Sequence, residues 1–199
     1  MKNYGFTLVE MIVSLALFSV VAVIAIGALL KVIDANDKAQ SIQSSVTDLN
    51  FALESMSRDL RTGTDYTCGS YANTPSSLST VIPCQISSGN SYIAFNSSRT
   101  ASRADRSICN LVTAYAFTSS PVSLQKAEQT SCDQTDYSFS DLISPTDMNI
   151  TSYELGVLYN SPGPSYPLAF IRITGNAGTR EQNRTYVDLE TAVSARSQQ

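Results

Sequence analysis

Residues 1–27 read MKNYGFTLVEMIVSLALFSVVAVIAIG, and this stretch decides what kind of fold the chain adopts. From Met11 to Leu30 there are 20 consecutive residues without a charge, and most of them are Val, Ile, Leu or Ala. At about 1.5 Å per residue, an apolar helix of this length crosses a hydrocarbon core of about 30 Å. The stretch therefore predicts a membrane-spanning helix. Glu10 places a carboxylate at its start, where a lone charge costs about 3 kcal/mol unless it is partnered.

The flanks of the apolar run bear on its orientation. Lys2 is the only charged residue ahead of Glu10, so the positive-inside rule places the N-terminus in the cytoplasm and the rest of the chain on the far side of the membrane. A cleaved secretory signal is the alternative, since such a signal has a short apolar core and ends at a small-residue site. Residues 25–27, Ala-Ile-Gly, make only a passable site, and the apolar character continues through Leu30. We therefore favour the membrane span.

Residues 5–10, Gly-Phe-Thr-Leu-Val-Glu, resemble the prepilin signature G-F-T-L-x-E of type IV pilins and of the pseudopilins of type II secretion. The resemblance implies a pilin-like α+β fold, in which a long N-terminal helix, half membrane-spanning and half amphipathic, packs on a mainly antiparallel β-sheet domain. The implied parts are a prepilin leader at 1–5, a transmembrane and assembly helix at 6–30, an amphipathic helix at 31–62, and a disulfide-containing, β-rich globular domain at 63–199.

The same resemblance implies a role for three residues. A prepilin peptidase would cleave after Gly5 on the cytoplasmic face, and Phe6 would become the N-methylated mature N-terminus. Glu10 would then pair with the N-terminal ammonium of a neighbouring subunit. The physical reason is that opposite charges attract strongly in a low dielectric and each is costly alone. A subunit that enters a fibre satisfies both charges by offering one partner and receiving the other.

Beyond the membrane span, the pattern predicts that the helix continues as an amphipathic one to about Thr62. Apolar residues recur at spacings of four and three along one face, as a packing face requires: Ile42, Val46, Leu49, Leu53, Met56 and Leu60. No proline or glycine interrupts residues 28–61, and Gly63 is the expected stop. We expect this face to pack on the chain's own domain, because a free coiled coil needs a longer repeat with organised flanking charges.

Residues 52–61, Ala-Leu-Glu-Ser-Met-Ser-Arg-Asp-Leu-Arg, resemble the end of this helix in J-type minor pseudopilins and W-type minor pilins. The tail Thr191-Ala192-Val193-Ser194 is similar to the final strand of the J-type proteins. The resemblance implies a minor subunit. The alternative for Arg58 and Asp59 is that they are solvated charges on the helix surface.

The composition excludes several classes of function. The chain has 199 residues, a net charge of −4 and no histidine, so it lacks the side chain that titrates near neutrality and the commonest metal ligand. The sequence contains no nucleophile–base pair, phosphate-binding glycine loop or metal-ligand cluster. We therefore expect no enzyme activity, no cofactor and no metal site, and the negative charge argues against a nucleic-acid partner.

Four cysteines lie beyond the apolar helix, and an even number there suggests two disulfides in an oxidising compartment. Three connectivities are possible. We favour Cys68–Cys84 and Cys109–Cys132, because each closes a short loop in a polar, turn-rich stretch. Four reduced, partly buried thiols are the alternative.

After Gly63 the composition shifts to short alternating or apolar runs between turn residues, which is typical of an antiparallel sheet. The predicted strands are Ser91–Asn96, Leu111–Thr118, Thr151–Tyr159, Leu168–Thr174 and Thr185–Val193. The segment Ser97–Ser107, with three arginines, is predicted as a solvated loop, and a phosphate contact is its alternative. The long polar segment Ser119–Asn149 is expected to hold further structure or a functional surface.

Together these observations predict a minor pilin or minor pseudopilin that primes or caps the assembly of a type IV pilus or type II secretion pseudopilus. The alternative is a pilus-associated adhesin or a DNA- or substrate-binding module on the same anchor. The expected partners are other pilin or pseudopilin subunits, prepilin peptidase, the inner-membrane assembly platform and membrane lipid. The expected location is the inner membrane, crossed once with the globular domain outside the cytoplasm, and then a fibre in the periplasm or outside the cell.

Overall fold

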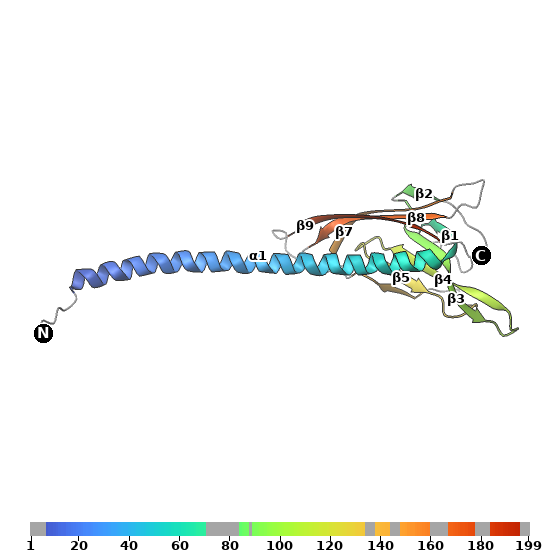
Figure 1. The fold of residues 1–199 in the computed structure, drawn as a ribbon, viewed down its shortest axis with the longest axis horizontal. Coiled ribbons are helices and arrows are strands. Elements are labelled where there is room, and N and C mark those ends of the chain that lie inside the picture. The colour runs from blue at the N-terminus through green and yellow to red at the C-terminus, as the bar shows by residue number, and fades with distance from the viewer. Residues whose placement is uncertain are drawn as a thin grey trace. The chain divides into compact units, whose positions relative to one another are not determined.

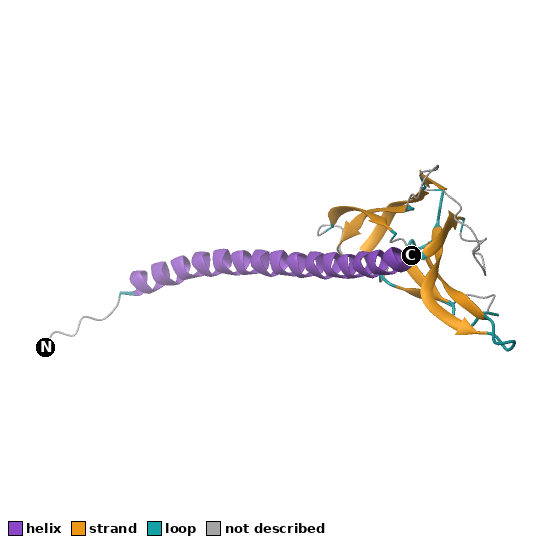
Figure 2. Ribbon diagram, turned by 45° about the vertical axis from the view of Figure 1, so that its right-hand side comes forward, coloured by secondary structure: helices purple, strands orange, loops and turns teal. Residues whose placement is uncertain are grey.

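The computed structural model describes residues 7–70, 84–87, 89–133, 138–143, 148–159, 167–177 and 184–195. One helix and nine strands lie within these ranges (Figures 1 and 2). They are α1 (Leu8–Thr62), β1 (Thr64–Gly69), β2 (Cys84–Ser87), β3 (Tyr92–Ser102), β4 (Ile108–Phe117), β5 (Leu124–Glu128), β6 (Phe139–Asp141), β7 (Met148–Leu158), β8 (Leu168–Ala177) and β9 (Thr185–Ser194). The chain forms two compact units, Met1–Gln40 and Ser41–Gln199, and α1 contributes to both.

In the second unit, one face of α1 is buried against the β-sheets, as the amphipathic pattern predicts. The buried residues recur at spacings of four, three, four and four: Ser45, Leu49, Ala52, Met56 and Leu60. Ile42, Val46 and Leu53, which belong to the predicted stripe, are only half-buried. The packed stripe is therefore rotated slightly from the purely apolar one and includes Ser45 and Ala52.

The helix ends at Thr62, one residue before the predicted stop. The Tyr66 hydroxyl donates to the carbonyl oxygens of Leu60 and Gly63, and in this way satisfies carbonyls that the helix end leaves without a partner. Gly63 is needed for space, since a Cβ atom there would lie 2.4 Å from Cδ2 of Phe95. The chain therefore turns from the helix into β1 directly over an aromatic ring of the core.

The strands form two antiparallel sheets. The five-stranded sheet has the order β1-β3-β4-β5-β6, and the four-stranded sheet has the order β2-β7-β8-β9. Every pair of neighbours is antiparallel. One long N-terminal helix packed against antiparallel sheets is the α+β, pilin-like arrangement that the sequence predicts, and the structure confirms it.

One core holds the second unit together, because the buried face of α1 and the inner faces of both sheets share it. Leu60 of the helix, Phe95 of the five-stranded sheet and Ile171 of the four-stranded sheet are each fully buried in it. At about 25 cal/mol per Å² of apolar area, such burial is the main term that holds the helix to the sheets. A smaller cluster, with Tyr92, Val112 and Phe139, occupies the other face of the five-stranded sheet.

All five predicted strands are confirmed, with ends that differ by a few residues. Four strands were not predicted: β1, β2, β5 and β6. The sequence of β5, Leu-Gln-Lys-Ala-Glu, consists of helix-forming residues, and pairing with β4 and β6 on both sides overrides that preference. The other three have only three to six residues, too few to show an alternation. Within the described parts of Ser119–Asn149 lie β5, β6 and the start of β7, so this segment holds further structure.

The prediction of a loop at Ser97–Ser107 is wrong. β3 continues to Ser102 and pairs with the start of β4 in the register Ser102↔Ile108, so that a tight turn at residues 103–107 joins them. Ser and Arg side chains suggested a loop because both faces of this hairpin are solvated, which hides the alternation of a half-buried strand. We call residues Ser97–Asn110 the arm.

Candidate functional site

The N-terminal end of α1 is built by a local capping interaction. The backbone N–H of Glu10 donates to Oγ1 of Thr7 at 3.3 Å, and Thr7 immediately precedes the helix, which begins at Leu8. The spacing Thr-x-x-Glu is that of a capping box, in which the first residue caps the helix and the acidic residue lies in its first turn. This signal was present in the sequence and was missed. This capping interaction fixes Glu10 in the first turn of the helix, where the positive end of the helix dipole stabilises a carboxylate.

The Glu10 side chain is exposed, and it has no hydrogen bond or ion pair with any residue in the described parts of the chain. Gly5 and Phe6, the other two residues that the sequence predicts to act here, lie outside the described residues. The structure thus presents a carboxylate available to a partner, at the start of an apolar helix.

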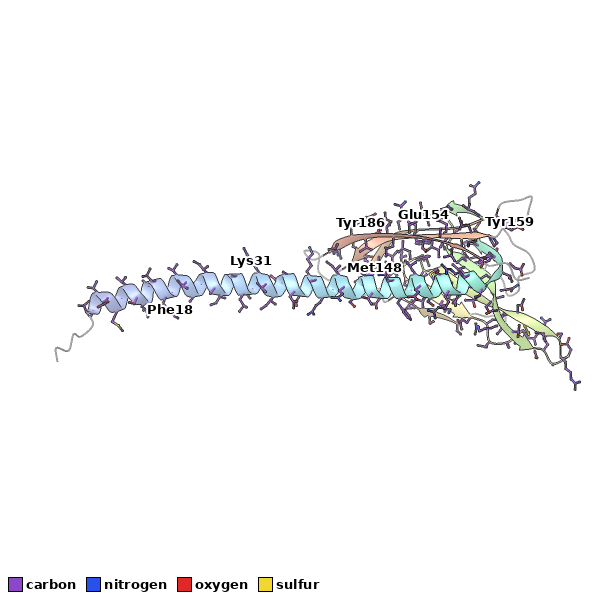
Figure 3. All side chains as sticks on the ribbon, viewed as in Figure 1. Phe18, Lys31, Met148, Glu154, Tyr159 and Tyr186 are labelled. Atoms are coloured by element: carbon purple, nitrogen blue, oxygen red, sulfur yellow. A yellow bond between two sulfur atoms is a disulfide. The ribbon has the colours of Figure 1, made fainter. Side chains whose placement is uncertain are left out.

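The first half of α1 exposes large apolar side chains on all sides, as with Phe18 at 71% exposure (Figure 3). Its two serine hydroxyls are satisfied within the helix, because the Ser14 hydroxyl donates to the Glu10 carbonyl at 2.7 Å and the Ser19 hydroxyl to the Leu15 carbonyl at 2.8 Å. Such internal pairing suits a helix surrounded by lipid. By length and composition α1 is able to cross a membrane. These features agree with a membrane-anchored protein.

A second cluster of polar side chains lies at the other end of α1. The Lys126 ammonium lies 2.7 Å from a carboxylate oxygen of Asp59 and 2.6 Å from one of Glu128. The Tyr115 hydroxyl donates to the same Asp59 oxygen at 2.5 Å. Arg99 then pairs with Glu128 at 3.1 Å. The cluster therefore links the last turns of the helix to β4, β5 and the base of the arm.

The surroundings of this cluster shift the titration of its members. Burial lowers the pKa of Lys126, but hydrogen bonds to Asp59 and Glu128 outweigh it, and the net pKa is raised. Burial, together with the hydrogen bond to Asp59, raises the pKa of Tyr115. Asp59 is thus a structural anchor between helix and sheet, whereas Arg58 is an exposed residue that pairs with Glu54 on the helix surface at 3.3 Å.

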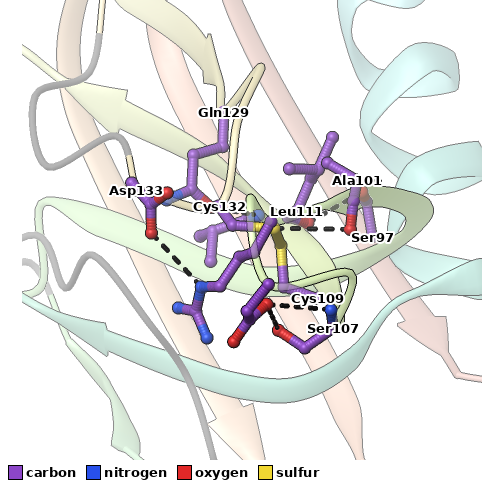
Figure 4. Close-up of a disulfide and its surroundings, with 11 residues drawn as sticks. Ser97, Ala101, Ser107, Cys109, Leu111, Gln129, Cys132 and Asp133 are labelled. Atoms are coloured by element: carbon purple, nitrogen blue, oxygen red, sulfur yellow. Dashed lines mark hydrogen bonds and ion pairs between the residues drawn. A yellow bond between two sulfur atoms is a disulfide. The ribbon is translucent and has the colours of Figure 1, made fainter.

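The four cysteines form two disulfides, Cys68–Cys84 and Cys109–Cys132, which are the pairs favoured from the sequence. Their Cα atoms are 6.1 and 5.9 Å apart. The first joins β1 to β2, and so connects the two sheets covalently. The second holds the arm to the segment that follows β5 (Figure 4).

Two of the three arginines in the arm already have acidic partners. Arg99 pairs with Glu128, and Nε of Arg103 donates to Asp133 at 3.2 Å. Since these guanidinium groups are engaged by carboxylates, the arm is poorly suited to bind phosphate along a nucleic-acid backbone. The described residues also bring together no group of three His, Cys, Asp or Glu side chains that would hold a metal ion.

Comparison with known proteins identifies one shared feature. The prokaryotic N-terminal methylation motif matches residues 1–26, which include Gly5, Phe6, Glu10 and most of the apolar stretch. No curated protein and no solved structure matches the chain. The match agrees with the exposed carboxylate and the apolar helix described above. The chain carries the N-terminal methylation motif that is the signature of type IV pilins and pseudopilins.

Proposed function

We propose that this pilin-like protein is a minor pilin or minor pseudopilin, a structural subunit that primes or caps the assembly of a type IV pilus or a type II secretion pseudopilus. The observation that carries the proposal is the Glu10 carboxylate, exposed in the first turn of an apolar helix and without a partner in the described chain. The methylation motif over residues 1–26 supports it.

The proposed mechanism begins in the membrane. Prepilin peptidase cleaves after Gly5, and Phe6 becomes an N-methylated terminus that carries a positive charge. In lipid that ammonium and the Glu10 carboxylate are each costly alone. When a subunit joins the fibre, its Glu10 binds the amine of a neighbour, and both charges are paired in a low dielectric. The pair therefore fixes the register between subunits, while apolar contacts between the helices supply most of the binding.

The proposed location follows from the same helix. The chain crosses the inner membrane once, with its N-terminus in the cytoplasm and its disulfide-bonded domain on the other side, where cysteines are oxidised. Its partners are other pilin or pseudopilin subunits, the peptidase, the assembly platform and lipid. Assembly of this kind involves no reaction catalysed by the chain itself.

Two features support a minor rather than a major subunit. The β-rich part of the chain is large, with two sheets and a projecting arm. The helix ends in the sequence Arg-Asp-Leu-Arg at residues 58–61, which resembles J-type and W-type minor subunits. An adhesive or DNA-binding module on the same anchor has less support, because Arg99 and Arg103 are already paired with acids.

The test is Glu10→Gln, which removes the charge and keeps the shape of the side chain. We expect processing and methylation to continue and incorporation into the fibre to fall at least about tenfold, since one unpaired charge in lipid is worth more than 1.4 kcal/mol. Glu54→Gln is the matched control, because Glu54 lies on the same helix in an exposed ion pair. Normal incorporation of Glu10→Gln, or equal loss in both variants, would contradict the role of Glu10.

A further inference from the structure

The outer face of the four-stranded sheet has an apolar end. The register aligns Leu158, Leu168 and Ser194 in one row across β7, β8 and β9, and Gly156, Phe170 and Ala192 in the next. Leu158 is 44% exposed, and its neighbour Tyr159 is 43% exposed. Phe170 is half-buried in this row, and Ile86 of β2 lies against Gly156. Exposed apolar side chains grouped in this way are typical of a protein–protein contact.

The next row of the same face is acidic. Glu154, Arg172 and Glu190 are aligned across the three strands. Arg172 already forms an ion pair with Asp188, to which it donates two hydrogen bonds of 3.1 and 2.8 Å. Glu154 and Glu190 have no ion pair within 4.0 Å among the described residues. The row itself holds two carboxylates and one guanidinium, and Asp188 in the adjoining row adds a third carboxylate, so this part of the face has a net negative charge beside the apolar end.

The arm offers the complementary chemistry. Arg106 is exposed at its turn and has no acidic partner among the described residues, and Ile108 is 73% exposed. Asp105, the one acid in the turn, accepts hydrogen bonds from the Ser107 N–H at 2.9 Å and from its hydroxyl at 2.6 Å. The arm therefore ends in one available cation and one available apolar side chain.

The arm is also held in place before any partner binds. The Cys109–Cys132 disulfide joins its second strand to the segment after β5, the pair Arg99–Glu128 lies at its first strand, and the pair Arg103–Asp133 lies at its turn. A projection ordered in advance loses little entropy on docking. In Figure 1 the arm, the green end of β3 and β4, extends away from the side on which β8 and β9 lie.

We propose that the arm of one copy docks on the outer face of the four-stranded sheet of a second copy, with Ile108 against Leu158 and Phe170, and Arg106 beside Glu154 and Glu190. The two surfaces differ and lie on different parts of one unit, so the contact between the two copies is heterologous. The proposal names a partner for the fibre subunit and so rests on the proposed function.

The first experiment detects the contact itself. Full-length Arg106→Lys protein in detergent keeps the positive charge and gains a primary amine, which a carbodiimide links directly to a carboxylate. The sample is an equal mixture of unlabelled and ¹⁵N-labelled chains, so that links between copies contain both isotopes. We expect mixed-isotope links between position 106 and Glu154 or Glu190. Their absence, or links within single chains only, would overturn the proposal.

The second experiment tests the chemistry by charge exchange. Arg106→Glu should lower the fraction of dimer in sedimentation at least about tenfold, because like charges then face each other. Combining it with Glu154→Arg and Glu190→Arg should restore the dimer. Ile108→Ser should weaken the dimer, and Ile108→Leu should leave it intact. Arg61→Glu, an exposed change of equal charge at the end of α1, is the control.

The outcomes separate this proposal from the proposed function. An unchanged thermal melt shows that each variant is folded, and the intact mass of the same sample reports cleavage after Gly5 and methylation of Phe6. Failure of the charge exchange in a correctly processed, folded protein overturns the arm contact alone. If Arg61→Glu lowers the fraction of dimer as much as Arg106→Glu does, the arm contact is also overturned, because the change in net charge would then explain the effect of both variants.

Discussion

The ammonium of Lys126 lies 2.7 Å from the carboxylate of Asp59, and this contact joins β5 to the last turns of α1. Both side chains are largely covered, with exposures of 18% and 30%. A pair of this kind, strengthened by the hydroxyl of Tyr115, holds the helix at one position on the sheets. The contact thus fixes how the last turns of α1 pack on the sheets.

Asp59→Ala should lower the free energy of unfolding of the globular domain by about 1–2 kcal/mol, because it removes the acceptor of Tyr115 and one partner of the half-buried Lys126. Urea unfolding of the full chain in detergent measures the change. Glu54→Ala, which breaks the exposed pair with Arg58, is the control and should change stability by less than about 0.5 kcal/mol. Equal effects in the two variants would show that Asp59 is only a surface charge.

Stability should fall in alkaline solution. Burial raises the pKa of Tyr66 and of Tyr115 above the ordinary 10.0, and for Lys126 the two carboxylates raise the pKa above 10.5 despite burial. In each case the unfolded chain releases its proton first, so the folded state binds more protons in that window. The stability that these three groups contribute to the folded state is therefore complete below about pH 10. It is lost as the pH rises through the pKa values that the groups have in the folded state.

Urea unfolding at a series of values from about pH 8 to about pH 11 measures this dependence. Tyr115→Phe removes one of the three groups and should make the alkaline fall shallower. Tyr186→Phe is the matched control, since Tyr186 is 65% exposed on β9. An alkaline fall as steep in Tyr115→Phe as in the parent chain would contradict the assignment.

Gly63→Ala should destabilise the domain by about 1–3 kcal/mol, because the added methyl group would lie 2.4 Å from the Phe95 ring and would force the ring or the helix end to move. Gly27→Ala is the control, since nothing lies within 4 Å of a Cβ atom at that position. Thermal melting of the two variants compares them. If Gly63→Ala melts at the same temperature as the parent chain, the packing of the helix end on Phe95 does not require a glycine at position 63.

The sequence predicted the elements whose signal is local. The helix is visible from its uninterrupted run and its apolar spacing, and β9 from the alternation of polar and apolar residues between Thr185 and Val193. The capping spacing from Thr7 to Glu10 is equally local, although it was missed. The processing residues Gly5 and Phe6 rest on the motif alone, because they lie outside the described residues.

What the sequence did not predict depends on contacts between distant residues. The residues of β5 favour a helix, and only its two neighbouring strands make it extended. The arm looked like a loop because its strands are solvated on both faces. The sequence left open whether Asp59 is a solvated surface charge, because Lys126, its partner, is far away along the chain. In each case tertiary pairing decided an outcome that local preference left open or opposed.

We propose above that the chain is processed and assembled as a pilin-type subunit. The intact mass of the protein extracted from membranes of its own cells tests it most directly. We expect a mass that lacks Met1–Gly5 and carries one additional methyl group, with fragmentation that places the methyl on the amine of Phe6. A mass that retains residues 1–5, or one that corresponds to cleavage near Gly27, would contradict it.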